Sequence, residues 1–166
     1  MGKPIKPIQN NAECERILSN SYTGSLVMCN DENPYAVPIN HSYYSGKLYF
    51  HCATEGRKLE MIRENPKVCY MANSYFGDPV NYKKGMVCHG EWESVIAYGN
   101  ARVLEEPAEI CKAFVKFMKH YGSDDYEPSE ESLETTTAIV IDIESMTARR
   151  EPARYQVEYW YWSPSG

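Results

Sequence analysis

The 166-residue sequence lacks any apolar run approaching the roughly 18 residues that a membrane-spanning helix needs. Its first residues, Met1 to Ile8, are polar and proline-containing, without the apolar centre of a secretory signal peptide. We therefore expect a cytoplasmic protein with no membrane partner. An excess of basic residues is also missing, since the formal net charge is −6. This charge disfavours general binding to nucleic acid, and we expect no nucleic-acid partner.

The cysteines lack the spacing of a metal or redox motif, because no C-x-x-C occurs. In a reducing compartment we expect free thiols, most of them buried as small apolar residues. Two Cys-His neighbours, at residues 51–52 and 88–89, would point to opposite faces of a strand, so we expect no metal site. The six cysteines are Cys14, Cys29, Cys52, Cys69, Cys88 and Cys111.

The length fits one domain, residues 1–166, with a sizeable hydrophobic core. Residues 1–10 are expected to form an N-terminal arm. Residues 123–136 contain six carboxylates and no basic residue, which predicts a solvated, mobile loop. Residues 151–166 form an aromatic tail, either a last strand or an arm packed on a partner.

Three segments have the pattern of helices. Residues 11–19 follow a capping asparagine, Asn10 or Asn11. Residues 56–64 carry a small apolar stripe and end before a proline. Residues 107–121 begin with proline and end at Gly122, and their apolar stripe predicts packing in the core or at a dimer interface.

The remaining periodic segments predict a mainly β protein. Strands expected at hairpin spacing, without repeated strand-helix-strand units, favour an antiparallel barrel with appended helices. Ser45-Gly46 is expected to be a hairpin turn, and residues 73–85 a loop. The predicted strands are residues 25–29, 35–44, 47–52, 68–72, 86–90, 94–104 and 137–143.

One segment carries chemistry at the junction of a predicted strand and a helix. The strand ends at His51-Cys-Ala, and the helix opens at Gly56-Arg57-Lys58. Free N–H groups and a positive dipole end mark a helix N-terminus, so basic side chains there suggest a bound anion. Arg57 and Lys58 could hold a phosphate. The same pattern also fits two solvated surface charges and a structural histidine.

This segment resembles the FMN-binding split-barrel superfamily that includes pyridoxamine 5'-phosphate oxidase, and most closely its nitroimidazole-resistance (Nim-like) branch. The resemblance rests on Tyr49-Phe-His-Cys-Ala-x-x-Gly-Arg-Lys-Leu, on Asn65-Pro66, and on Trp92-Glu-Ser-Val-Ile-Ala-Tyr-Gly99-Asn-Ala-Arg-Val. It covers about residues 11 to 121, and residues 137–150 fit the closing strand. It implies a six-stranded antiparallel Greek-key barrel that forms a homodimer with FMN at the interface.

The resemblance also implies the residues around the FMN. Arg57 and Lys58 match the phosphate-binding pair. Trp92, Ser94 and Val95 match positions that reach the flavin from the second subunit. Strand packing is the alternative for these residues, and it would explain Trp92 nearly as well. The other matching residues are Val37, Pro38, Ile39 and Asn40 along the flavin ring, and His51, Cys52 and Ala53 beside the ribityl phosphate.

The implied activity is that of an FMN-dependent oxidoreductase, which passes electrons from a reduced nicotinamide or another donor to a small acceptor. In Nim-like relatives the acceptor is nitroaromatic. The oxidase itself is disfavoured, because Ala36 stands near the place of its arginine and its C-terminal substrate motif is missing. With no dinucleotide-binding glycine fingerprint, a nicotinamide would bind only transiently. His41 and His51 are the candidates for proton transfer.

A binding protein is the alternative to an enzyme. Split barrels can hold FMN, haem or a deazaflavin as carriers or sensors with little catalysis. Haem would need an axial ligand, for which the candidates are His41, His51 and His89.

Overall fold

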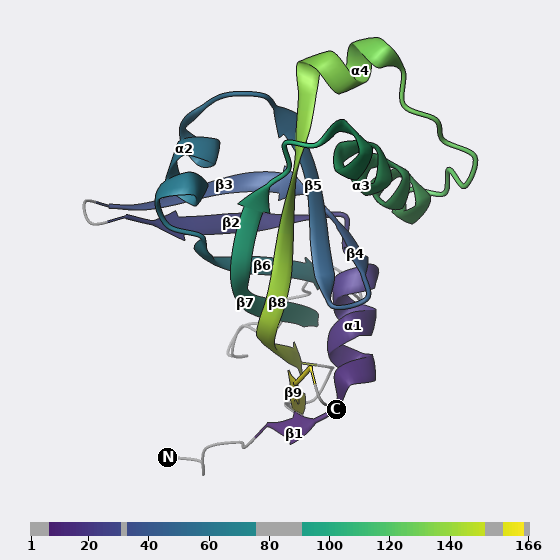
Figure 1. Cartoon of the computed structure of the whole chain (residues 1–166). Helices are drawn as coiled ribbons and strands as arrows, with labels where there is room; N and C mark the ends of the chain where they lie inside the picture. Colours follow the sequence, from purple (N-terminus) through teal and green to yellow (C-terminus); the bar gives the residue numbers. More distant parts are fainter. Residues whose placement is uncertain (1–6, 31–32, 76–90, 152–157, 165–166) are drawn as a thin grey trace, which may run out of the picture.

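The computed structural model describes residues 7–30, 33–75, 91–151 and 158–164 (Figure 1). The strand predicted at residues 86–90, with Cys88 and His89, lies outside this part of the chain, as does most of the loop predicted at residues 73–85. Among the described residues, no helix has both the length and the apolar character needed to cross a membrane.

The three predicted helices are confirmed, and a fourth accompanies them. They are α1 (Asn11–Ser19), α2 (Arg57–Glu64), α3 (Pro107–His120) and α4 (Glu130–Thr135). The strands are β1 (Ile8–Gln9), β2 (Thr23–Cys29), β3 (Pro34–Asn40), β4 (Ser42–Tyr44), β5 (Lys47–Ala53), β6 (Lys67–Tyr75), β7 (Trp92–Val103), β8 (Thr136–Glu151) and β9 (Glu158–Trp162).

The strands form one open mixed sheet, which confirms the mainly β prediction. Its main path runs β1-β9-β8-β7-β6-β2-β3, and β5 pairs with both β4 and β8. The β1–β9 pair is parallel, and the other described pairs are antiparallel. β8 is long because its first half pairs with β5 and its second half with β9. The aromatic tail therefore supplies a last strand.

The sheet has a large core on its inner face and a smaller one under α3. Alternation along β5 serves both, because Leu48 and Phe50 join the large core while Tyr49 joins the small one. Ile110 and Phe114 of the predicted α3 stripe are buried in the small core. Figure 1 shows α3 lying beside β5, and α4 where β8 begins.

Turn and cap chemistry fixes several boundaries as the sequence predicts. The Asn10 side chain accepts a hydrogen bond from the Glu13 N–H at 3.2 Å and caps α1. Ser45 and Gly46 have φ values of 49° and 76°, which is the backbone of a tight hairpin turn between β4 and β5. Gly122, with φ 85°, follows α3.

The predicted loop at residues 123–136 is partly wrong, because it contains α4. The Ser129 hydroxyl accepts from the Ser132 N–H at 3.2 Å and caps this helix. Glu130 and Glu131 lie in its first turn, where the helix dipole favours negative charge. Leu133 packs against the small core. The acidic composition of this segment therefore predicted a loop where the chain forms a capped helix.

Two further predictions need correction. Residues 35–44 are not one strand, because the chain leaves β3 at His41 and continues as β4. The cysteines are free thiols among the described residues, but most are not buried: Cys14 is buried, Cys29 is exposed, and Cys52, Cys69 and Cys111 are half-buried. Cys29 and Cys69 lie at outward-facing strand positions, which leaves their thiols open to solvent.

Candidate functional site

The N-terminus of α2 is a positive pole without a side-chain cap. Gly56 occupies the cap position with φ 124°, and no side-chain cap bond is formed within the described chain. The Leu59 N–H donates to the Gly56 carbonyl at 2.9 Å, so the N–H groups of Arg57 and Lys58 precede the first helical bond. A Cβ at Gly56 would meet nothing within 4 Å, so the approach is open. This terminus can accept an anion.

The two basic side chains flank this terminus. The exposed Arg57 guanidinium lies over the Tyr35 ring, 4.6 Å from its centroid, which links α2 to β3. Lys58 is half-buried and close enough to act on β5. Partial burial first, and then the charge of Lys58, lower the pKa of His51.

The end of β5 presents its residues to two faces, as predicted. His51 is exposed and meets the Phe117 ring edge-on, with centroids 4.5 Å apart. Cys52 is half-buried against the large core, and burial raises the pKa of its thiol while Lys58 opposes the rise. Ala53 is exposed. His51, Ala53 and the basic pair therefore share one open region.

The residues predicted along the flavin ring divide between the faces of β3. Val37 and Ile39 are half-buried and pack against the large core, whereas Pro38 and Asn40 are exposed on the outer face. Only the latter two offer side chains to a ligand on that face.

The residues predicted on β7 divide in the same way. Trp92 and Ser94 are half-buried on the outer face, and the Arg149 guanidinium lies over the Trp92 ring at 5.3 Å. Val95 is 1% exposed and belongs to the large core. Strand alternation therefore turns the Val95 side chain away from the outer face.

An uncharged strip joins these positions across the outer face. Its residues face one another across neighbouring strands. Three exposed aromatic or apolar side chains lie on or beside the strip: Met71, Tyr98 and Tyr161. The strip crosses β3, β2, β6, β7, β8 and β9 through Pro38, Ser25, Met71, Ile96, Thr147 and Tyr161.

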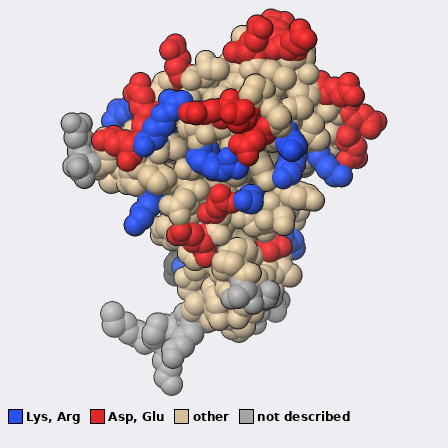
Figure 2. Space-filling view, in the orientation of Figure 1, with Lys and Arg blue, Asp and Glu red and all other residues tan. Residues whose placement is uncertain are grey.

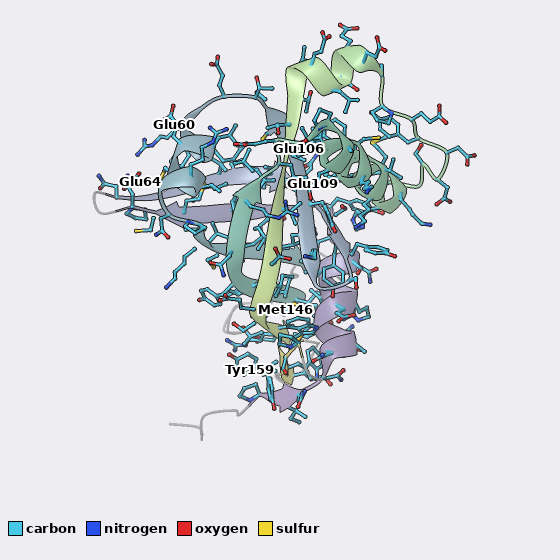
Figure 3. All side chains as sticks on the ribbon, viewed as in Figure 1. Glu60, Glu64, Glu106, Glu109, Met146 and Tyr159 are labelled. Carbon is cyan, nitrogen blue, oxygen red and sulfur yellow. The ribbon has the colours of Figure 1, made fainter. Side chains whose placement is uncertain are left out.

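A single chain does not bring Trp92 and Ser94 to the positive pole of α2. Ser94 pairs with Arg149 on the half of β8 that meets β9, whereas β5 pairs with the other half. Figure 3 shows the two ends: Met146 and Tyr159 mark the β8–β9 end, and Glu60 and Glu64 mark α2 at a distance from it.

His41 is not a substrate-side group. Its side chain is 0% exposed, and its two ring nitrogens lie 3.0 Å from the Leu18 carbonyl and 2.6 Å from the Tyr70 hydroxyl. Burial chiefly lowers its pKa to about 4. The prediction of His41 as a proton-transfer group is therefore wrong, because its side chain lies in the core on the same side as Val37 and Ile39.

Sequence reasoning missed a pocket beside His51. It has a volume of about 140 Å³ and is mainly apolar. Phe114, Phe117 and Met118 of α3 form one wall, and Tyr126 and Ser132, before and within α4, form another. The α3 stripe was a visible signal, but it predicts packing equally well. The α4 wall carried no such signal.

Comparison with known proteins places the chain in a family. The sequence profile of the pyridoxamine 5'-phosphate oxidase family matches residues 10–150, so the chain belongs to this family and to its split-barrel superfamily. An uncharacterized protein of Rhizobium meliloti is 27% identical over 101 residues. That match spans 61% of this chain and 58% of the relative's length.

Solved structures share the fold. A candidate 5-nitroimidazole antibiotic resistance protein from Bacteroides thetaiotaomicron superposes with a TM-score of 0.72 and 26% identity, covering 85% of this chain and 84% of that one. A FAD-binding protein from Mesorhizobium loti gives 0.65 and 23%, covering 86% and 96%. A FAD and heme binding protein from Mycobacterium smegmatis gives 0.72 and 12%, covering 92% and 82%.

Proposed function

We propose that this protein is a cytoplasmic flavoprotein that binds FMN in a homodimer and reduces a small acceptor with electrons from a reduced nicotinamide or another donor. The observation that carries the proposal is the uncapped, open N-terminus of α2, with Arg57 and Lys58 beside the end of β5. The solved relatives that bind FAD support a flavin as the ligand class.

The residues present fit the phosphate end of FMN. The first turn of α2 carries two backbone N–H groups, one guanidinium and one ammonium, and the space beside Gly56 is open. Each is a donor that suits a dianionic phosphate, and the arginine adds a planar fork. The cation–π contact holds the guanidinium over Tyr35, which lies on the same face of β3 as Val37 and Ile39, while Pro38 and Asn40 face the other side of the strand.

When bound, FMN supplies the two-electron chemistry, and the chain supplies binding, orientation and proton handling. Arg57 and Lys58 hold the phosphate, and His51 is the accessible group that can exchange a proton near neutral pH. Its lowered pKa keeps the ring mostly neutral at pH 7.

The homodimer is part of the same proposal. Trp92 and Ser94 lie on the outer face with Pro38 and Asn40, and the uncharged strip connects them. A second copy on this face would cover exposed apolar side chains and bring its Trp92 and Ser94 towards the first copy's site. The continuation of β3 through His41 into β4, which pairs with β5, supports closure into a six-stranded Greek-key split barrel.

The phosphate site is tested by replacing the two basic residues of α2. Arg57→Ala and Lys58→Ala should each weaken FMN binding by about 1.5–3 kcal/mol, because each removes a charge-assisted bond. Arg63→Ala, in the last turn of the same helix, is the matched control and should leave FMN affinity unchanged. Titration of flavin fluorescence gives the three affinities. Equal affinities for all three variants would overturn the assignment.

The same preparations separate an enzyme from a carrier. Reoxidation of the reduced flavin by a nitroaromatic acceptor, faster than by oxygen alone, supports the oxidoreductase. Flavin retention without such reoxidation would make the protein a carrier or sensor.

The dimer is tested on its proposed interface. Tyr98→Lys should shift sedimentation from dimer to monomer, because it puts a charge beside the uncharged strip of the outer face. Tyr44→Lys is the matched control, since both tyrosines are 53% exposed but Tyr44 lies on β4. A Tyr98→Lys variant that remains dimeric would place the interface elsewhere.

A further inference from the structure

The pocket between α3 and α4 has the size of a one-ring compound. Its volume is about 140 Å³, and an apolar cavity of about 150 Å³ in another protein binds benzene. The three fused rings of a flavin do not fit such a space. The pocket is therefore separate from the proposed flavin position. His51 lines this pocket and is also one of the residues expected beside the flavin phosphate.

The walls suit an aromatic ring. Phe114, Phe117 and Met118 line one side, and Tyr126 lies opposite. Phe117 already packs edge-to-face with His51, at an interplanar angle of 81°. A ligand ring can extend this packing, which is a favoured geometry for aromatic pairs.

The rim on the α4 side is negative. Tyr126 lies between Asp125 and Glu127, and Ser132 follows Glu131, and all three carboxylates are exposed. Figure 2 shows acidic side chains gathered over α4 and the loop before it. Of the cations on neighbouring elements, Lys119 is paired with Asp124 at 3.4 Å, and Lys58 is close enough to lower the pKa of His51.

We infer that this pocket binds one-ring aromatic compounds, and that its acidic rim selects a neutral or cationic ring over an anionic one. The inference does not rest on the proposed function, because the pocket walls belong to the chain alone. The observations that carry the inference are the one-ring volume, the aromatic walls beside His51 and the negative rim.

Three probes of the same shape test the charge selection: benzamidine, benzamide and benzoate. They carry a positive, a neutral and a negative group on one benzene ring. We expect benzamidine to bind about threefold more tightly than benzamide, as for one exposed ion pair, and benzoate to bind most weakly. Benzoate binding as tight as or tighter than benzamidine would overturn the inference. Ligand-detected NMR gives the three affinities.

Two variants with matched controls locate the binding. Ser132→Phe fills the pocket and should abolish the benzamidine signal, while Thr135→Phe, exposed on the same helix, should preserve it. Glu127→Gln with Glu131→Gln should remove the preference for benzamidine. Glu144→Gln with Glu158→Gln, exposed on β8 and β9, should not. Unchanged binding to the Ser132→Phe variant would show that the probes bind elsewhere.

Measurements with and without added FMN keep the two proposals distinct. Ser132-dependent probe binding by a protein that takes up no FMN would refute the flavin function and leave the pocket as a ligand site. FMN binding without any probe binding would refute the pocket and leave the flavin function intact.

Discussion

The buried His41 is expected to make the folded protein less stable as the pH falls. The Leu18 carbonyl can only accept, so the Nε2 atom of His41 carries the hydrogen, and Nδ1 accepts from the Tyr70 hydroxyl. The neutral ring is thus fully paired in the core. Burial chiefly lowers its pKa from 6.5 to about 4, so between these values the unfolded chain binds more protons than the folded one.

The expected loss follows from these two pKa values. Stability contributed by neutral His41 is present above pH 6.5 and declines as the pH falls towards 4. The whole interval corresponds to about 3 kcal/mol, of which about 2 kcal/mol is lost between pH 7 and pH 5. His51, whose pKa is also lowered, acts in the same direction, so the two histidines must be separated.

Urea unfolding at pH 7 and pH 5 measures this loss. A His41→Gln variant should lose about 2 kcal/mol less than the parent over this range, whereas His51→Gln should retain the loss that comes from His41. An NMR titration of the His41 ring provides a check that needs no variant. A His41 pKa near 6.5, or equal losses in parent and His41→Gln, would refute the reasoning.

Other predictions concern stability and can be checked by urea unfolding at pH 7. Arg16→Gln should destabilise the fold by about 1–3 kcal/mol, because it leaves buried Glu93 without its 2.8 Å partner. Arg102→Gln is its control: the exposed pair with Glu109 should contribute at most about 1 kcal/mol, and a larger effect would contradict the burial argument. Asn10→Ala should cost about 1 kcal/mol through the lost α1 cap, and an unchanged midpoint would show that this cap is dispensable.

The periodic segments explain why much of the fold could be predicted. β5 and β7 alternate cleanly, and α3 combines an N-terminal proline, an apolar stripe and a terminal glycine, so short-range pattern decided these elements. The basic pair at α2 could be found for the same reason, since helix start and charge are local features. The local pattern predicted only the first half of β8, because the second half pairs with β9, which is distant in the sequence.

The incorrect predictions concern tertiary placement. His41 continues the alternation of Tyr35, Val37 and Ile39, and this face packs against the large core, where the Leu18 carbonyl and Tyr70 hydroxyl pair with the His41 ring. The local pattern did not show which face of the strand the core covers. The pocket beside His51 depends on α4 folding over α3, and no local pattern encodes that contact. Contacts between residues of two copies of the chain likewise cannot be predicted from a local sequence pattern.

The central claim is that this protein is an FMN-binding flavoprotein, and the absorbance spectrum of the purified protein tests it most directly. We predict flavin bands, and release of FMN on denaturation. A colourless protein that takes up no added FMN would contradict the proposed function while leaving the fold in place. A haem spectrum would also contradict FMN as the cofactor, and would move the assignment to a haem-binding protein.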